Sequence, residues 1–177
     1  SDDATGQITA RYMCKNECRF GYFQMLRTTI NNFGLPVSLY SDRHSIFRSP
    51  IADKISIEDQ LAGVTVNDTQ FGRAVSELGI TLIPARSPQA KGRIERLWET
   101  LQSRLPVEFA IRNIKTMEEA NDFLSSYIFK FNDMFSVEPQ DYESAFRPVP
   151  EGLNLDHSLC IKEQRSLDRG GVFSYYN

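Results

Sequence analysis

The sequence lacks both a long apolar run and a targeting segment. No hydrophobic stretch approaches the roughly 18 residues that a helix needs to cross a bilayer. The opening residues, Ser-Asp-Asp-Ala-Thr-Gly, carry neither the basic region nor the apolar stretch of a signal peptide. We therefore expect a protein that is neither secreted nor inserted in a membrane.

Cysteine is also scarce. The three cysteines are Cys14, Cys18 and Cys160. An odd number of cysteines without a secretory signal indicates a reducing compartment. Cys14 and Cys18 could be zinc ligands, but no second pair of ligands lies near them in the sequence. We therefore interpret them as ordinary core or surface thiols.

A basic excess, which is typical of proteins that bind nucleic acid, is absent. The formal net charge is -3. Locally, however, the segment from residue 86 to residue 104 is rich in basic residues. It contains Arg86, Lys91, Arg93, Arg96 and Arg104 against Glu95 and Glu99. Contacts with phosphates would be concentrated there, although charge alone fits a solvated helix face better.

What the sequence does contain is enough for one sizeable domain. It has 177 residues, of which 41% are hydrophobic. The character of the chain changes after Phe135, where prolines and glycine mark an irregular stretch. We predict a folded core over residues 1–136 and an extended segment over residues 137–177. Residues 170–176 look like a turn and the first strand of a small β module.

Within the core, apolar residues switch between a period of two and a period of three to four. Strands are expected over residues 6–13, 35–40 and 80–84, and helices over residues 17–33, 69–78, 87 to at least 104, and 117–135. In the last helix the inward residues are predicted to be Ala120, Phe123, Leu124, Tyr127, Ile128 and Phe131. Gly34 and Gly79 end two of the helices. Residues 49–68 show no period and indicate a long loop, of a kind that is often functional.

Two acidic residues occupy positions suited to a metal site. Asp42 follows a predicted buried strand, where sites form in open α/β sheets. Glu95 lies on the helix that follows the next strand. The apolar stripe of that helix, including Leu97 and Trp98, is expected to pack on the sheet, with Trp98 in the core. Two carboxylates suit a hard divalent cation. From spacing alone, however, the favoured interpretation is that Asp42 caps a loop and that Glu95 pairs with Lys91 or with neighbours of Glu99.

Three segments resemble a known family. Residues 40–47, Tyr-Ser-Asp-Arg-His-Ser-Ile-Phe, resemble the surroundings of the second aspartate of transposases and retroviral-type integrases. Residues 70–80 resemble the helix and strand that follow. Residues 87–96, Ser-Pro-Gln-Ala-Lys-Gly-Arg-Ile-Glu-Arg, resemble the signature that delivers the catalytic glutamate. The likeness covers roughly residues 2–150 and is closest to bacterial insertion-sequence transposases of the ISNCY type.

The resemblance implies an α/β, ribonuclease H-like (retroviral integrase-type) core, with a mixed sheet flanked by helices. It implies a DDE transposase that uses Mg²⁺, with Mn²⁺ as a substitute, for DNA cleavage and strand transfer in transposition, integration and recombination. Asp42 and Glu95 would be catalytic metal ligands. The residues that would bind DNA are Lys91, Arg93, Arg96 and Arg86. His44 would support the metal ligands or lie in the loop beside them, and direct contact with the metal or the scissile phosphate is the alternative. The protein would be bacterial, cytoplasmic and nucleoid-associated.

The first aspartate of the family's triad lies on the first of three strands that precede the first helix. Only one strand is predicted before that helix here, so the first strands are expected to be missing and the first aspartate to lie upstream of Ser1. Asp2 or Asp3 is the alternative. On this interpretation the chain alone is inactive, because two carboxylates hold Mg²⁺ weakly.

Two other functions remain open at this point. One is an RNase H-like nuclease that hydrolyses but does not join DNA. The other is a non-catalytic DNA-binding or assembly fragment of a decayed transposase. In either case the partner is DNA, at transposon ends or target, and a missing first hairpin would leave a sheet edge that favours a homodimer or higher assembly.

Overall fold

The structure has two hydrophobic cores, and helix α1 (Arg19–Phe33) forms one side of the larger one. The computed structural model describes residues 1–42, 44–47, 49, 68–85 and 92–173. In α1 the side chains of Phe23, Leu26 and Ile30 recur at helical spacing and are buried. The helix ends at Gly34, whose φ of 97° favours glycine. The helix predicted over residues 17–33 is thereby confirmed.

A strand–helix–strand unit follows α1. The chain forms β1 (Leu35–Pro36) and β2 (Ser38–Ser41), then α3 (Gln70–Glu77) and β3 (Thr81–Pro84). Strands β2 and β3 are parallel, with Ser38 opposite Thr81 and Ser41 opposite Pro84. The strands expected over residues 35–40 and 80–84 and the helix over 69–78 are confirmed, with a break at Val37. Most of the predicted 49–68 loop lies outside the described residues.

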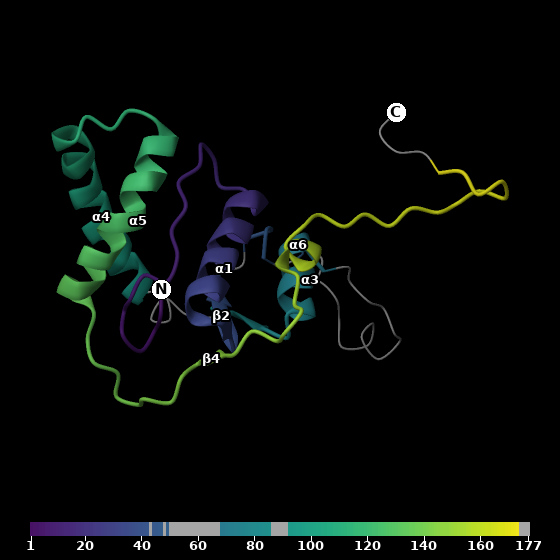
Figure 1. The fold of residues 1–177 in the computed structure, drawn as a ribbon, viewed down its shortest axis with the longest axis horizontal. Coiled ribbons are helices and arrows are strands. Elements are labelled where there is room, and N and C mark those ends of the chain that lie inside the picture. The colour runs from purple at the N-terminus through teal and green to yellow at the C-terminus, as the bar shows by residue number, and fades with distance from the viewer. Residues whose placement is uncertain (43, 48, 50–67, 86–91, 174–177) are drawn as a thin grey trace.

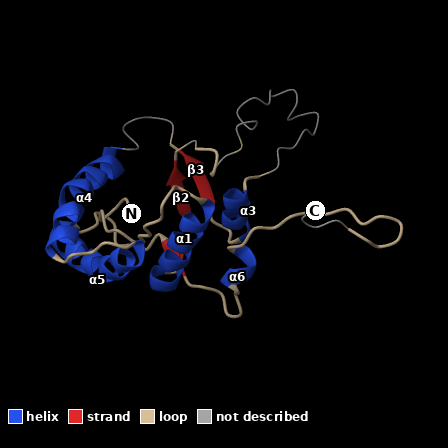
Figure 2. Ribbon diagram, turned by 90° about the horizontal axis from the view of Figure 1, so that it is seen from above, coloured by secondary structure: helices blue, strands red, loops and turns tan. Residues whose placement is uncertain are grey.

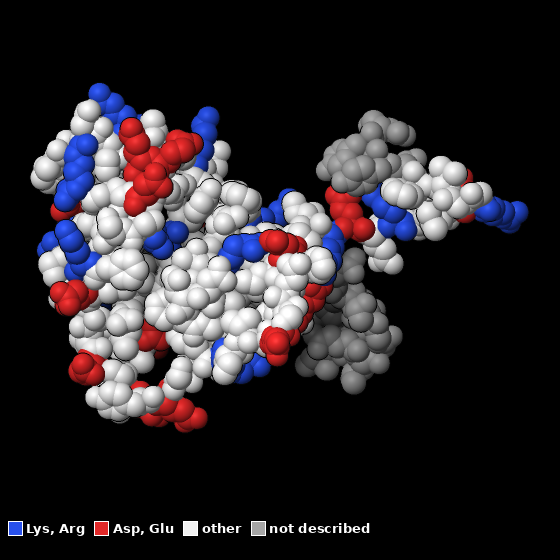
Figure 3. Space-filling view, viewed as in Figure 1, with Lys and Arg blue, Asp and Glu red and all other residues white. Residues whose placement is uncertain are grey.

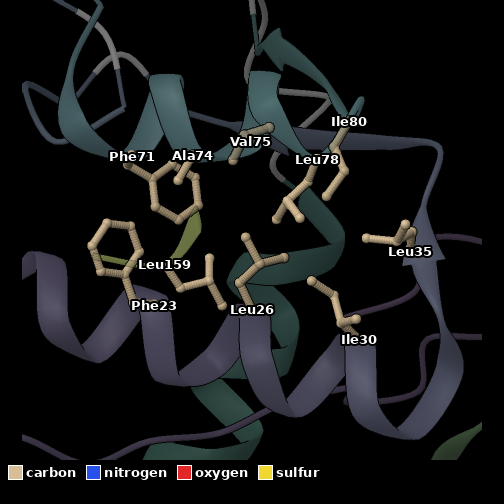
Figure 4. Close-up of a cluster of buried hydrophobic side chains, with 10 residues drawn as sticks. All are labelled: Phe23, Leu26, Ile30, Leu35, Phe71, Ala74, Val75, Leu78, Ile80 and Leu159. Atoms are coloured by element: carbon tan, nitrogen blue, oxygen red, sulfur yellow. The ribbon is translucent and has the colours of Figure 1, made fainter. Parts of the chain in front are cut away.

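The first core lies between α1 and α3. Figure 4 shows the side chains of α1 pointing toward those of α3, with Leu35 and Ile80 closing one end. The buried set is Phe23, Leu26, Ile30, Leu35, Phe71, Ala74, Val75, Leu78, Ile80 and Leu159. Leu39 of β2 and Leu82 of β3 pack against this cluster, whereas Tyr40 is 64% exposed. Helices α1 and α3 therefore cover one face of the β2–β3 pair.

The segment after residue 136 returns to this core. Strand β4 (Phe146–Arg147) pairs antiparallel with β1, and helix α6 (Leu155–Ser158) brings Leu159 into the cluster. Lys162 still contacts Gln70 and Glu77 of α3, and beyond it the chain leaves the body of the molecule (Figure 1). The predicted division at residue 136 is thus crossed by β4 and Leu159, and the β module expected from residue 170 lies partly outside the described residues.

Helices α4 (Gly92–Ile111) and α5 (Met117–Phe135) lie side by side and are joined by a short turn (Figure 1). A capping box starts α5, because Thr116 accepts a hydrogen bond from the Glu119 N–H and Glu119 accepts from Thr116 in return. The Arg104 guanidinium lies 4.8 Å from the centre of the Phe135 ring and links the two helices. The expected helix over residues 117–135 and its inward face are confirmed, with Phe123 only partly buried.

The stripe of α4 packs differently from the prediction. Leu97, Leu101 and Leu105 contact α5 and Ile8 in a second core, not the strands. Trp98 is 54% exposed, so its predicted place in the core is wrong. The reason is that α5 offers α4 a continuous apolar face, and one helical stripe cannot cover two surfaces.

The strand predicted over residues 6–13 does not form. The alternation of buried and exposed residues is present at Ile8 and Ala10, but these residues have no strand partner among the described ones. Instead, Asn132 of α5 accepts from the Ile8 N–H at 2.8 Å and donates to its carbonyl at 3.1 Å. Asn121 does the same for Met13, at 2.8 and 2.9 Å. Helix α5 thus satisfies the backbone that a neighbouring strand would otherwise pair with.

Both asparagines can bond the extended segment because their spacing along α5 equals the spacing of Ile8 and Met13 along that segment. Eleven residues of α-helix and five residues of extended chain each span about 16 Å. The two asparagines therefore lie opposite Ile8 and Met13 at the same time. No periodicity of apolar residues reports this arrangement, because it is made by two polar side chains.

Replacing Asn132 by alanine should destabilise the protein by about 2–4 kcal/mol, because the Ile8 N–H and C=O both lose their partner in a partly buried position. Urea unfolding followed by circular dichroism measures the change. Asp133→Ala, at the exposed neighbouring position, should change stability by less than about 0.5 kcal/mol. Equal effects of the two substitutions would show that the asparagine contacts contribute nothing.

Among the residues that the structure describes, no helix has both the length and the apolar character needed to cross a membrane.

Candidate functional site

Asp42 lies directly after β2, at the end of the parallel pair, and is exposed. Its Oδ1 accepts a hydrogen bond from the His44 N–H at 3.0 Å. The turn continues with the Phe47 N–H donating to the His44 carbonyl at 2.9 Å. Asp42 therefore does cap a turn, as one reading of the sequence predicted, while its side chain remains open to solvent. A capping role and a ligand role are compatible.

Aromatic residues fix the turn after Asp42 to the first core. The Phe47 ring packs edge-on against Tyr22 at 4.7 Å and against Phe71 at 5.2 Å. The Thr69 hydroxyl, which also caps α3, donates to the Phe47 carbonyl at 3.3 Å. Contacts from α1 and α3 thus restrain the backbone that carries Asp42. Sequence reasoning missed these supports, because they lie far apart in the chain and look like ordinary core residues.

Tyr22 connects the start of α1 to this turn. Its hydroxyl donates to the Glu17 carboxylate. Burial raises the pKa of Tyr22, and the hydrogen bond to Glu17 and the negative charge of Asp42 raise it further. Tyr22 therefore stays protonated at neutral pH.

Glu95 lies in the first turn of α4 and is exposed, as is Arg96 beside it. In Figure 2 the beginning of α4 and the ends of β2 and β3 lie toward the same side of the molecule. Arg86 and Lys91 lie outside the described residues, as does the side chain of Arg93. No group of three or more His, Cys, Asp or Glu side chains that could hold a metal ion occurs among the described residues.

Asp2 has a local role. Its Oδ2 accepts hydrogen bonds from the Thr5 N–H at 2.8 Å and from the Thr5 hydroxyl at 2.6 Å. The Asp2 carbonyl accepts from the Gly6 N–H at 3.0 Å. These bonds make Asp2 the cap of the first turn of the chain, which leaves its Oδ2 less suited to a metal ion than the open carboxylate of Asp42.

Charged side chains are dispersed on the face seen in Figure 3. Lysine and arginine alternate there with aspartate and glutamate over the described elements, and uncharged atoms fill most of the area. This face therefore has no continuous basic field that would follow a DNA backbone.

The arrangement is a parallel strand–helix–strand unit made by β2, α3 and β3. The exposed carboxylate of Asp42 lies at the end of β2, and that of Glu95 lies on α4, the helix that follows the unit. Oxygen ligands in an open position of this kind suit a hard divalent cation.

Two proteins named as transposases resemble nearly the whole chain. The transposase for insertion sequence IS1202 of Streptococcus pneumoniae is 37% identical over 176 residues, which cover 99% of this chain and 36% of that protein. The y4bF protein of Sinorhizobium fredii (strain NBRC 101917 / NGR234), provisionally named a transposase, is 36% identical over 177 residues, which cover 98% of this chain and 36% of that protein. No family model matches the chain, and no solved structure matches it.

The chain thus spans about a third of the length of these relatives, 36% in each case. The match extends over nearly the whole chain, 99% in one case and 98% in the other. It supports a relation to insertion-sequence transposases.

Proposed function

We propose that this chain is part of the catalytic core of a DDE-type transposase with a ribonuclease H-like fold, related to ISNCY-type elements. The observation that supports this most directly is the position of Asp42 at the end of the parallel β2–β3 pair, with Glu95 in the first turn of the next helix. The similarity to named transposases over nearly the whole chain supports it independently.

In this proposal Asp42 and Glu95 hold Mg²⁺, or Mn²⁺ in its place. Both are exposed carboxylates, and hard cations bound to such oxygens keep open positions for water and phosphate. When bound, such an ion supplies charge stabilisation for the attacking and leaving oxygens of a phosphodiester. The chain holds Asp42 in place through the turn that Phe47 and Thr69 anchor.

A DNA cleavage and strand-transfer assay tests the proposal. The full-length gene product should cut a labelled duplex that carries the element's ends and join the freed 3′-hydroxyl to target DNA, with Mg²⁺ or Mn²⁺ and not with EDTA. Hydrolysis without joined products would replace the proposal with a nuclease. DNA binding without either reaction would replace it with an assembly function.

The basic segment is proposed to hold the DNA backbone through Arg86, Lys91, Arg93 and Arg96. Arg96→Ala should weaken DNA binding at all sequences alike and lower the slope of log K against log salt concentration by about 1. Fluorescence anisotropy over a salt series measures both quantities. Arg112→Ala, at the far end of α4 and also exposed, is the matched control and should leave the slope unchanged. Equal slopes for the unaltered protein, Arg96→Ala and Arg112→Ala would contradict the proposal that Arg96 contacts a DNA phosphate.

The proposed assembly is a homodimer or higher oligomer on DNA. Light scattering of the full-length gene product, with and without end DNA, distinguishes this from a monomer.

A further inference from the structure

The thiols of Cys14 and Cys18 converge on one glycine. A Cβ placed at Gly21 would lie 3.2 Å from the Sγ of Cys14 and 3.8 Å from the Sγ of Cys18. Gly21 is itself buried within α1. The absence of a side chain at this position therefore makes room for both sulfur atoms on the same side of the helix.

The two thiols differ in their surroundings. The Cys14 thiol donates to the Asn16 carbonyl at 3.0 Å. Burial raises the pKa of Cys14, and its hydrogen bond to Cys18 raises it further. Cys18 is the N-cap residue of α1 and makes no side-chain capping bond. Its sulfur is therefore not held by a bond to the backbone of the helix.

Both cysteines are free and only partly buried, so small reagents can reach them. A metal site is the weaker interpretation of this pair. No third His, Cys, Asp or Glu completes a cluster with them among the described residues. Glu17, which lies between the two cysteines in the sequence, directs its carboxylate to the Tyr22 hydroxyl.

We propose that Cys14 and Cys18 form a redox-active dithiol that closes to an intramolecular disulfide by exchange with a low-molecular-weight disulfide. Cys18 loses its proton to water, and its thiolate attacks one sulfur of the small disulfide. The S–S bond of that molecule breaks, one small thiolate leaves, and a mixed disulfide forms at Cys18.

The second exchange completes the balance. Cys14 loses its proton and attacks the Cys18 sulfur, so that the Cys14–Cys18 bond forms and the second small thiolate leaves. The two small thiolates take up the two protons. The protein pair is oxidised by two electrons, and the small disulfide is reduced to two thiols.

Closure would restrain the segment between the cysteines, including Glu17 and the start of α1. This places the dithiol next to the hydrogen bond between Glu17 and Tyr22. The inference does not depend on the proposed reaction with DNA, because the exchange is measured on the protein alone.

The experiment equilibrates the full chain with graded ratios of oxidised to reduced glutathione, quenches with acid, and determines the thiols by alkylation and mass spectrometry. The expected product has lost two hydrogen atoms on the peptide that contains Cys14 and Cys18, and carries no glutathione there. Cys160 should remain alkylatable or carry glutathione. Glutathione on both Cys14 and Cys18, disulfides only between chains, or a pair that stays reduced throughout would each overturn the proposal.

Three variants sharpen the test. Cys14→Ser and Cys18→Ser should each lose the intramolecular disulfide and form a mixed disulfide with glutathione on the remaining cysteine. Cys160→Ser should leave closure unchanged. Gly21→Ala should lower the equilibrium constant for closure, because its Cβ would lie 3.2 Å from the Cys14 sulfur and that sulfur would have to shift to make room. Closure of Gly21→Ala at the unaltered ratio, with an unaltered circular dichroism spectrum, would contradict the geometric argument.

Discussion

Asp42→Asn should reduce strand transfer by the full-length gene product at least about a thousandfold. A divalent ion contributes several kcal/mol of charge stabilisation in the transition state, and each 1.4 kcal/mol corresponds to about tenfold in rate. Asparagine keeps the size of the side chain but not the negative charge that holds the ion. Glu95→Gln should have an effect of the same size.

Stability should hardly change in these variants. Both side chains are exposed, and the asparagine oxygen can still accept from the His44 N–H. Thermal unfolding of each variant checks this point and separates loss of activity from loss of fold.

Glu99→Gln is the matched control, because Glu99 lies one turn further along α4 and is equally exposed. It should retain activity. The double variant Asp42→Asn/Glu95→Gln should be no worse than either single one, since ligands of one site act as a unit. If Asp42→Asn kept strand-transfer activity within about tenfold of the unaltered protein, Asp42 would not be a metal ligand.

Gly34→Ala should destabilise the protein by more than about 3 kcal/mol, a large part of the 5–15 kcal/mol that is typical for a domain. Gly34 has φ 97° and ψ -173°, a region that residues with a Cβ avoid. A Cβ at this position would lie 2.4 Å from the carbonyl oxygen of Arg147. Because that oxygen belongs to β4, the substitution forces apart the β1–β4 pair as well as the end of α1.

Gly152→Ala provides the control. Gly152 also has a positive φ, 78°, but an added Cβ would have no neighbour within 4 Å. Its cost should be only about 1 kcal/mol, from backbone strain alone. The difference in the free energy of unfolding between the two variants, measured in urea, isolates the contact with Arg147. Equal destabilisation would show that β4 does not press on Gly34.

The helices could be predicted from the sequence because each carries its own signal. The apolar positions of α1 and α5 recur at helical spacing, and Gly34 and Thr116 mark boundaries by their own conformational preferences. These signals depend on neighbours within one or two turns, so no knowledge of the tertiary structure is needed to interpret them.

Residues 6–13 show where this reasoning fails. Their alternation predicted one apolar face made by Ile8, Ala10 and Tyr12, of which Ile8 and Ala10 are buried and Tyr12 is 36% exposed. It could not predict their hydrogen-bonding partner, because two asparagines more than a hundred residues away in the chain take that place. The prediction that Trp98 is buried was wrong for a related reason. Helical periodicity predicts an apolar stripe, but the position of α5 decides which part of that stripe is buried.

In the candidate site, too, some residues could be found from the sequence and others only from the structure. Asp42 and Glu95 could be singled out by motif, and the structure adds that Asp42 is exposed at the end of a parallel pair. The anchors of Asp42 have no motif. Tyr22, Phe47 and Thr69 come together only when α1 and α3 pack.

The sequence by itself therefore determined the order and type of the main helices and strands, and the acidic residues proposed for catalysis, because both depend on local patterns. Only the tertiary structure decided what each apolar stripe covers, which groups satisfy the backbone of residues 6–13, and that Cys14 and Cys18 meet at Gly21. These outcomes depend on contacts between distant segments, and the side chains involved look the same in sequence whether or not they meet.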